Sequence, residues 1–386
     1  MRNTRYAVRA LWLVVVAAAI AALAAGLASS RAVAGGSTST AQPLAGKHIV
    51  FSECCEDPMF NDSWEPGIAA AMKWTKQGGT LSTINANSDN TTQLSQIQSI
   101  IGGKTAAAVL TVTEAGSGYA PVVKSAQKAG IIWGNYAGDP APGANLNILY
   151  PHYEAGYLAG VAAGKWLKTT QGGVGDAGTT INPNDPGLTE RTTGFIAGIK
   201  TVVPNIKFYQ ASASEGSVPD GAKVASQLLS THPSIKILFC YNETLSLGCV
   251  QGASEAGRSD PKTLYIVDDD ASTVGLQDMI KGNTPIQQVV TPDYEGDMAV
   301  LTAVTERAME GKSIPHTGVA NVTLIANKAA AVAELNAQTH PFSPKNVKRT
   351  LNAVRLYSGF SPPFGNSNVP KGPGILGSAY FAKYPF

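Results

Sequence analysis

The chain has few of the side chains from which catalytic and metal sites are usually built. Its 386 residues include only four cysteines and five histidines. The histidines are scattered, form no H-E-x-x-H motif and do not lie at zinc-ligand spacing from the cysteines, so we expect no metal site. No G-x-S-x-G nucleophile elbow occurs either. We therefore expect a protein that is not an enzyme, with no catalytic residue and no cofactor.

A phosphate-binding loop is also missing, although Gly103-Lys104-Thr105 has the ending of one. Such a loop needs a glycine five positions before Gly103, where the chain has Gln98. It also joins a strand to a helix, whereas this segment leads out of an expected helix into a strand. The segment therefore does not indicate a nucleotide site.

Neither sign of charge dominates the chain, which has 29 basic and 27 acidic residues and a formal net charge of +2. Residues 1–34 hold four arginines and no acid, so without them 25 basic residues face 27 acidic ones and the formal charge becomes −2. A near-neutral chain has no electrostatic footprint for nucleic acid or an anionic membrane. We expect neither as a partner.

The first 34 residues have the three parts of a secretory signal peptide. Three arginines before residue 10 form a positive region, residues 11–27 are almost wholly apolar, and Ala32-Val33-Ala34 is a small-x-small cleavage site. The apolar run is long enough for a membrane anchor instead, but the cleavage site and the polar linker at 35–46 favour removal. No cysteine follows at a lipidation position. We expect an exported protein, in the periplasm or otherwise outside the cytoplasmic membrane.

The four cysteines are Cys54, Cys55, Cys240 and Cys249. After export they would meet an oxidising compartment in which disulfides form, and four cysteines allow three pairings. Cys240 ends an expected strand and Cys249 lies in the helix that follows, so the sequence allows a local disulfide between them. Cys54 and Cys55 are adjacent, and a bridge between adjacent residues would be strained.

Short apolar runs alternate with segments of helical periodicity along most of the chain. Expected strands span residues 48–52, 80–85, 106–112, 131–135, 146–150, 172–180, 206–211, 235–241, 264–268 and 285–290. The glycine-rich strand 172–180 is expected only because of the alternation around it. Expected helices span 62–76, 91–101, 119–129, 153–167, 186–202, 220–230, 243–256, 272–281 and 294–311.

The strand-helix units repeat in two halves. This pattern is typical of an α/β protein with two Rossmann-like lobes, each built on a doubly wound parallel sheet. Residues 340–386 differ, since they are rich in proline, glycine and aromatic side chains. That segment is too aromatic for a disordered linker, and we expect it to pack along a lobe as loop.

Polar side chains follow several expected strands, at the carboxyl ends where open α/β sheets bind ligands. Together they bring carboxylates, amides, a guanidinium and aromatic rings to one crevice: Asp57, Phe60, Asn135, Tyr136, Arg191, Asn242 and Asp270. Carboxylate and amide oxygens accept from hydroxyls, a guanidinium donates in a planar fork, and a ring stacks on an apolar face. The set fits a polyhydroxylated or heterocyclic ligand.

Each of these residues also has a purely structural interpretation. Asp57 before Pro58 could start a turn, Asn61 could cap a helix, and Arg191 could be one more cation on a helix surface. The run Asp268-Asp269-Asp270 could bind a cation, although such a run more often supplies one ligand contact. The prediction of a site therefore depends on the whole set.

Short segments in a fixed order carry a resemblance over residues 48–325. They are Asp57-Pro58-Met59-Phe60, residues 91–105, Gly134-Asn135-Tyr136, Tyr153-Glu154-Ala155-Gly156, Glu190-Arg191-Thr192-Thr193-Gly194-Phe195, His232-Pro233, Phe239-Cys240-Tyr241-Asn242-Glu243, Leu247-Gly248 and residues 267–270. In this order the chain resembles the type I periplasmic solute-binding proteins of ABC transporters, in the branch that holds ribose and galactose receptors.

The resemblance implies a monomeric receptor that captures a small polar solute, above all a sugar, and delivers it to the permease of an ABC transporter. It implies that the residues at the strand ends line a cleft between two lobes, which close like a hinge. It also implies three crossovers, near Tyr150, Thr291 and Val319. The expected division is 1–34 signal peptide, 35–46 linker, 47–149 plus 291–318 N-terminal lobe, 150–290 plus 319–339 C-terminal lobe, and 340–386 tail.

The chain departs from the sugar-binding pattern at three places, which leaves the ligand open. Met59 stands where an aromatic residue is common, and Asn135-Tyr136 replaces an acid-arginine pair. Val290 stands where a glutamine is common, so Gln288 becomes the nearest candidate on that strand face. Residues 60–65 and 157–160 resemble nucleoside-binding membrane lipoproteins instead. A nucleoside receptor, a ligand sensor for a signalling partner and a secreted enzyme therefore stay as alternatives.

Overall fold

The structure is a computed structural model that describes residues 42–54, 63–87, 89–113, 118–137, 140–358 and 374–386. Residues Gln42–Phe386 form one compact unit. The expected leader, Cys55, Asp57 and Phe60 lie outside the described residues. In the part of the chain that is described, no helix has the length and apolar character needed to cross a bilayer.

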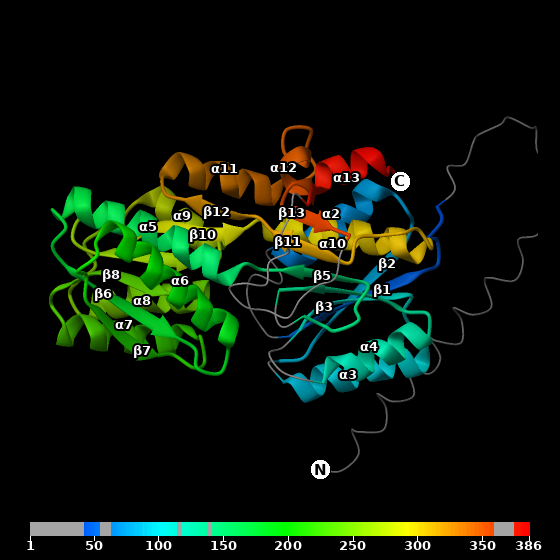
Figure 1. Cartoon of the computed structure of the whole chain (residues 1–386), viewed down its shortest axis with the longest axis horizontal. Coiled ribbons are helices and arrows are strands. Elements are labelled where there is room, and N and C mark those ends of the chain that lie inside the picture. The colour runs from blue at the N-terminus through cyan, green and yellow to red at the C-terminus, as the bar shows by residue number, and fades with distance from the viewer. Residues whose placement is uncertain (1–41, 55–62, 88, 114–117, 138–139, 359–373) are drawn as a thin grey trace, which may run out of the picture. The chain divides into compact units, whose positions relative to one another are not determined.

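The first lobe is built on an eight-stranded sheet with the order β14-β13-β11-β5-β4-β3-β1-β2 (Figure 1). The strands are β1 (His48–Glu53), β2 (Thr80–Asn85), β3 (Ala108–Val112), β4 (Ile132–Tyr136), β5 (Leu146–Leu149), β11 (Thr317–Ala320), β13 (Val354–Tyr357) and β14 (Ile375–Leu376). Neighbouring strands from β11 to β2 run parallel, whereas β13 and β14 are antiparallel additions.

The second lobe is built on a six-stranded sheet with the order β12-β10-β9-β8-β6-β7. The strands are β6 (Asp176–Ile181), β7 (Phe208–Ser212), β8 (Ile235–Cys240), β9 (Tyr265–Asp269), β10 (Ile286–Pro292) and β12 (Val322–Ile325). Only the edge strand β12 runs antiparallel to its neighbour. The prediction of an α/β chain with two parallel-sheet lobes is therefore confirmed.

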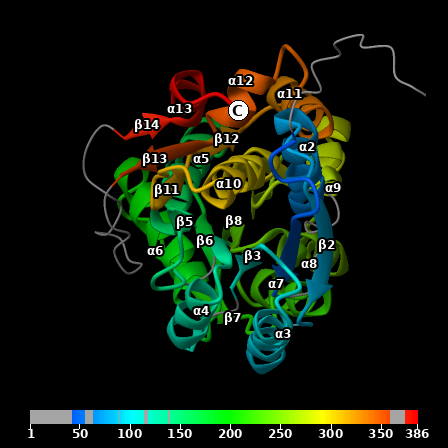
Figure 2. The same cartoon turned by 90° about the vertical axis from the view of Figure 1, so that its right-hand side faces the viewer.

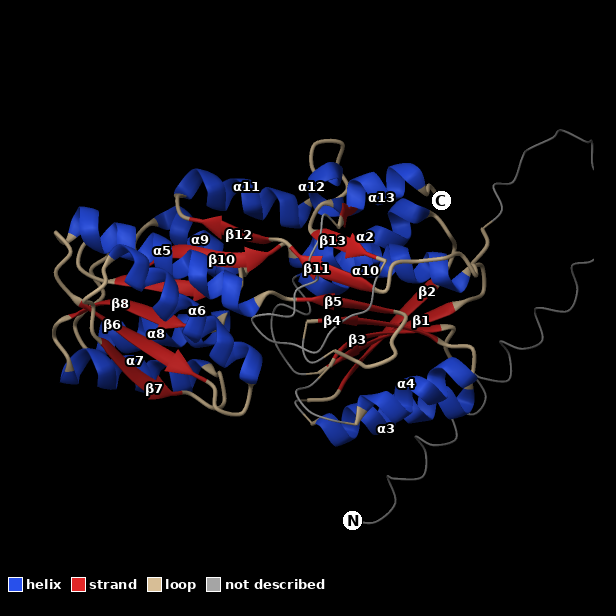
Figure 3. Cartoon of the chain, in the orientation of Figure 1, coloured by secondary structure: helices blue, strands red, loops and turns tan. Residues whose placement is uncertain are grey.

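Helices cover both faces of each sheet. Around the first sheet lie α2 (Glu65–Thr75), α3 (Asn90–Gly103), α4 (Tyr119–Lys128), α10 (Tyr294–Met309), α12 (Val347–Leu351) and α13 (Gly377–Lys383). Around the second lie α5 (His152–Thr170), α6 (Pro186–Val202), α7 (Val218–Thr231), α8 (Glu243–Glu255), α9 (Thr273–Lys281) and α11 (Lys328–Thr339). Figure 3 shows α3 and α4 on one face of the first sheet and α2, α10 and α13 on the other.

The alternation of side chains along β3 shows why its sequence is apolar at every position except Thr111. Ala108 and Leu110 are buried in the core that contains Met298 and Leu301 of α10. Val109, between them, is buried in a second core with Val123 of α4. Both faces of the strand are covered by helices, so neither face carries the alternating polar side chains of a solvent-exposed strand.

The glycine-rich segment does form a strand, β6, which is second from one edge of the second sheet, between the edge strand β7 and β8. The sequence of this strand has few large apolar side chains because its surroundings are tightly packed. At Gly178, a Cβ would lie 2.8 Å from Cδ1 of Leu238. Larger neighbours fill the space above the strand, so its own side chains stay small and give little periodic signal.

The chain passes between the two sheets at three places: between β5 and α5 at Tyr150, between β10 and α10 near Asp293, and between β11 and β12 at Asn321. After α11 it returns a fourth time, because β13 joins the first sheet beside β11. Arg349 of α12 fastens this return. It pairs with Glu334 of α11, and its Nε lies 3.5 Å from Oδ2 of Asp293.

The expectation that residues 340–386 pack as loop is wrong for the part that is described. The segment contains α12, β13, β14 and α13, and Figure 2 shows its strands beside β11. Val354 and Leu356 alternate inward on β13, while Tyr380 and Phe381 complete the core of the first lobe. Strands of four and two residues are too short to show periodicity in a sequence.

Candidate functional site

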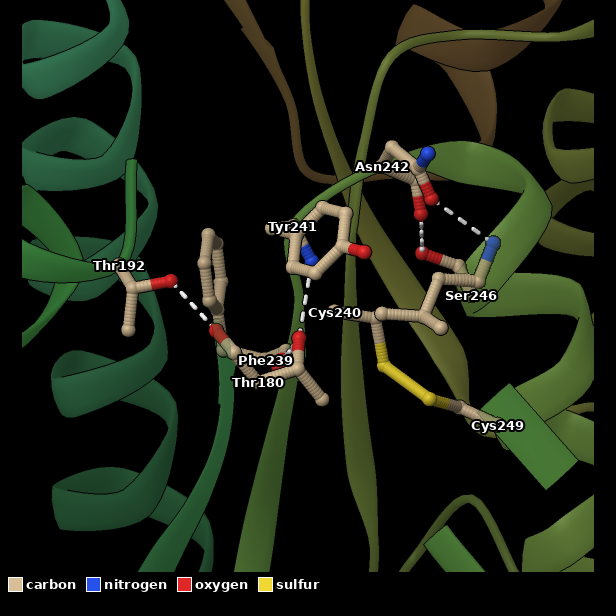
Figure 4. The surroundings of a disulfide bond; sticks show 9 residues. Thr180, Thr192, Phe239, Cys240, Tyr241, Asn242, Ser246 and Cys249 are labelled. Carbon is tan, nitrogen blue, oxygen red and sulfur yellow. Dashed lines mark hydrogen bonds between the residues drawn. A yellow bond between two sulfur atoms is a disulfide. The ribbon is translucent and has the colours of Figure 1, made fainter. Parts of the chain in front are cut away.

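Arg191 lies in the second turn of α6, at the carboxyl edge of the second sheet. The helix begins at Asp185, whose side chain accepts from the backbone N–H of Leu188, with Pro186 in the first turn. This arrangement is a regular N-terminal cap. Thr192 ties the helix to β6 by donating to the carbonyl of Thr180 at 2.6 Å, a contact drawn in Figure 4.

Two glycines let α5 and α6 touch through their backbones. A Cβ on Gly156 would lie 1.8 Å from the carbonyl oxygen of Arg191, and a Cβ on Gly194 would lie 2.1 Å from that of Tyr153. Neither position has room for a methyl group. The close approach brings Arg191 beside His152, at the start of α5.

Five groups contact the guanidinium of Arg191. Nη1 donates to Oδ2 of Asp270 and to the carbonyl of Tyr241, each at 2.8 Å, and lies 3.2 Å from Oδ1 of Asp269. Nε donates to Nδ1 of His152 at 3.0 Å. The ring of Tyr150 lies under the group, 4.5 Å from Cζ. Nη2 donates to none of the described residues.

Charge and burial act together in this cluster. Burial alone would lower the pKa of Arg191, but Asp269 and Asp270 raise it well above its ordinary value. Burial raises the pKa of Asp269 to about 7, with Arg191 opposing this rise. Burial, and then the Arg191 charge, hold the pKa of His152 well below its ordinary value. The imidazole is therefore neutral at pH 7.

Asp270 has a backbone conformation that side chains rarely adopt, with φ at +91°. Its backbone N–H donates to the carbonyl of Val290 at 2.8 Å, which fixes the turn at the end of β9. Unusual φ values in residues other than glycine cost free energy and are concentrated at functional sites. The conformation places the Asp270 carboxylate between Arg191 and Tyr294.

Two tyrosines from the crossings reach the consecutive carboxylates. Tyr150 donates its hydroxyl to Oδ1 of Asp269 at 2.8 Å, and Tyr294 donates to Oδ1 of Asp270. Tyr294 also packs against Trp64 and Tyr136, with ring centroids 5.8 and 6.1 Å away. The Arg191 cluster of the second lobe thus meets an aromatic cluster of the first.

The structure brings only part of the predicted set together. Tyr136 joins the aromatic cluster, and its hydroxyl donates to Asp297 at 2.8 Å. Asn135 accepts from the hydroxyl of Thr111 at 2.8 Å, at the end of β4. Asn242 accepts from the N–H of Leu245 and so caps α8, which gives this side chain a structural role.

Gln288 stands apart from this group. Its side chain is fully buried, accepts from the hydroxyl of Tyr265 at 2.7 Å and faces the carbonyl of Ala159 in α5. The pairing of β10 with β9 has an irregular register between Ile286 and Gln288. The amide therefore belongs to the interior of the second lobe, although the sequence placed it with the ligand-binding residues.

Cys240, at the end of β8, forms a disulfide with Cys249 in α8 (Figure 4). The bridge and the Asn242 cap together hold the turn between β8 and α8, close to the Tyr241 carbonyl that binds Arg191. Cys54 is buried at the end of β1. Among the residues that the structure places, no group of His, Cys, Asp and Glu side chains is arranged to hold a metal ion.

Five residues of the site were not predicted as such: Trp64, Tyr150, His152, Asp269 and Tyr294. The sequence indicates Tyr150 only as a crossover between lobes and His152 only as one of five scattered histidines. The run of three aspartates was noted, and it was the available signal for Asp269. Trp64 and Tyr294 begin helices, where an apolar ring is normally part of the core, so the sequence offered no signal for them.

Comparison with known proteins agrees with this architecture. A solved periplasmic solute-binding protein from Actinobacillus succinogenes, with bound D-allose, is 16% identical with a TM-score of 0.66, covering 74% of this chain and 99% of that one. A Mycobacterium smegmatis protein with β-D-fucofuranose is 20% identical with a TM-score of 0.67, covering 81% and 99%. An Agrobacterium radiobacter carbohydrate-transporter protein with D-arabinose is 18% identical with a TM-score of 0.67, covering 76% and 98%.

These identities are low enough that the solved structures establish a shared fold and no more. No curated protein sequence matches the chain. The family model described as a periplasmic binding protein domain matches residues 50–313, which is more than half of the chain. With its two parallel-sheet lobes and the cluster at their carboxyl edges, the chain therefore belongs to the periplasmic binding protein family.

Proposed function

We propose that the protein is an exported substrate-binding protein that captures a sugar between its lobes and delivers it to an ABC importer. One observation carries the proposal. Arg191 and Asp270 form a buried pair at the carboxyl edge of the second sheet, and Nη2 of Arg191 is left without a partner among the described residues. A planar donor beside a carboxylate acceptor suits adjacent hydroxyl groups of a sugar.

The ligands of similar proteins support a neutral polyhydroxylated compound. Solved structures of this fold hold D-allose, D-arabinose and myo-inositol. In this chain the single Arg191 charge is matched by the carboxylates of Asp269 and Asp270, so the cluster has no excess positive charge with which to hold an anion. A sugar would be bound through hydrogen bonds and stacking on a ring, without any need for a net charge on the ligand.

Binding would work without chemistry. Closing the lobes would bury the ligand and expel water, and each hydrogen bond would then contribute about 0.5–1.5 kcal/mol, or about 1.5–3 kcal/mol where one partner is charged. A few such bonds, less the cost of ordering, reach the micromolar range or better. Asp57 and Phe60, outside the described residues, would complete the first lobe's side of the cleft, with Asn135 and Asn242 at its margins.

The wider assignment follows the same proposal. Residues 1–34 would be removed on export to the periplasm or the outside of the cytoplasmic membrane. The first lobe, which includes β11 and the C-terminal elements α12 to α13, and the second lobe, which includes β10 and α11, would be the two halves of a monomer that docks on the permease. A sensor is the second candidate, because a fructose-binding periplasmic domain of a hybrid two-component system has the same fold at 19% identity and a TM-score of 0.64.

A thermal-shift screen of pentoses, hexoses, polyols and nucleosides tests the proposal, since a ligand of the native state raises the melting temperature. We expect a sugar to do so, and Arg191→Ala to weaken its binding at least tenfold. Lys168→Ala, an exposed cation on α5, is the matched control and should bind normally. A shift with nucleosides alone would support a nucleoside receptor. No shift with any compound would contradict the proposal.

A further inference from the structure

Two crossings between the lobes end in the same chemical contact. Tyr150 follows β5 of the first sheet and Tyr294 follows β10 of the second, and each donates its hydroxyl to one of the consecutive carboxylates at the end of β9. Both rings are almost completely buried. The two carboxylates are also the groups that hold Arg191. The segments that must bend when the lobes move are therefore bonded to the cluster proposed to bind the ligand.

The two contacts have different consequences for the cluster. Tyr150 holds Asp269 and also supports the guanidinium from below, whereas Asp270 is bonded by Tyr294 on one oxygen and by Arg191 on the other. Tyr294 stands at the start of α10, which packs in the first lobe, while Asp270 directly follows β9 of the second. This hydrogen bond therefore joins the two lobes directly at the binding cluster.

We propose that Tyr294 and Tyr150 are positioning residues that set the orientation of the lobes and the geometry of the Arg191–Asp270 pair together. A movement of either crossing displaces a phenol and with it a carboxylate. Conversely, a ligand that fixes the carboxylates restrains the crossings. This coupling deepens the proposed function and depends on it for the effect on binding, whereas the effect on the ligand-free protein does not.

The test uses the mature chain with Tyr294→Phe, Tyr150→Phe and the control Tyr157→Phe. Tyr157 lies on α5, partly exposed, and its hydroxyl contacts no carboxylate of the described residues. Small-angle X-ray scattering of the ligand-free proteins measures lobe orientation through the radius of gyration. We expect the radius of gyration of both test variants to differ from that of the wild type. For Tyr294→Phe we also expect a broader distribution of interatomic distances, whereas the control should scatter like the wild type.

Calorimetry with whichever sugar of the panel shifts the wild type gives the second readout. We expect about a tenfold loss of affinity for Tyr294→Phe, the scale of one hydrogen bond to a charged group. Unchanged scattering and unchanged affinity for Tyr294→Phe would overturn the inference, as would equal changes in the Tyr157→Phe control. If no panel compound binds the wild type, the proposed function fails, and the scattering of the ligand-free variants still decides the inference.

Discussion

Nε of Arg191 donates a hydrogen bond to Nδ1 of His152 at 3.0 Å. An imidazole nitrogen that accepts a hydrogen bond carries no proton, so His152 is neutral with its proton on Nε2. Protonation would place a second cation against the guanidinium in a buried site. The contact is therefore compatible with only one charge state of the histidine.

This contact predicts a loss of stability in acid. The pKa of His152 lies below its ordinary value in the folded protein, so the unfolded chain binds the proton first. Stability contributed by the neutral ring is present above about pH 6.5 and falls as the pH drops toward the lower folded pKa. His152→Asn, which keeps an acceptor near Nδ1, should flatten this fall in urea unfolding between pH 5 and 7. An unchanged pH slope would contradict it.

Asp270 allows backbone strain to be separated from binding. Replacing it with glycine or with alanine removes the carboxylate, and each variant should bind ligand at least tenfold more weakly. Only glycine relieves the φ of +91°. We expect Asp270→Gly to be more stable than Asp270→Ala by about 1 kcal/mol, the cost of a left-handed conformation. Urea unfolding of the pair measures this difference, and equal stability would show that the turn is not strained.

The contact of α5 with α6 predicts a strong effect of a single methyl group. Gly194→Ala would place a Cβ 2.1 Å from the carbonyl oxygen of Tyr153, so we expect a loss of about 1–3 kcal/mol from overpacking. Gly102→Ala is the matched control, since nothing lies within 4 Å of its Cβ in α3. There the change should be neutral or stabilising by up to about 1 kcal/mol. Similar effects at both positions would argue against the close approach.

The burial of Glu295 predicts an effect of pH on stability that is opposite in sign to that of His152. Burial, and then Asp293, raise the pKa of this carboxyl to about 8, so the folded protein holds a proton that the unfolded chain releases near pH 4.3. The resulting stability is complete below that value and is lost as the pH rises through about 8. Glu295→Gln should therefore be less sensitive to pH between 5 and 8 in urea unfolding. A parallel pH dependence in both proteins would contradict the assignment.

The sequence predicted the elements that have clear periodicity and the polar residues at strand ends. Arg191 and Asp270 were predicted together because both follow strands of one sheet, and parallel strands bring their carboxyl ends to one edge. Tyr150 and Tyr294 could not be assigned in this way. They lie on the segments that cross between the lobes, where the alternation of strands and helices gives no guidance. Their hydrogen-bond partners are 119 and 24 residues away in the chain.

Gln288 shows the opposite failure. A glutamine near the end of a strand looked like a ligand-binding group, but its partner Tyr265 comes from the neighbouring strand β9. Whether a strand residue faces a cleft or a covering helix depends on tertiary packing, which the sequence of one strand does not contain. The C-terminal strands were missed for a related reason, since their pairing with β11 is a long-range contact.

The position of β13 has a consequence for the behaviour of the protein in concentrated solution. Without it, β11 would present an open row of backbone donors and acceptors, which invites pairing with a strand of another molecule. β13 occupies that row, and the new outer strand β14 is only two residues long. The C-terminal segment thereby shortens the edge available for self-association, and so protects the first lobe against aggregation.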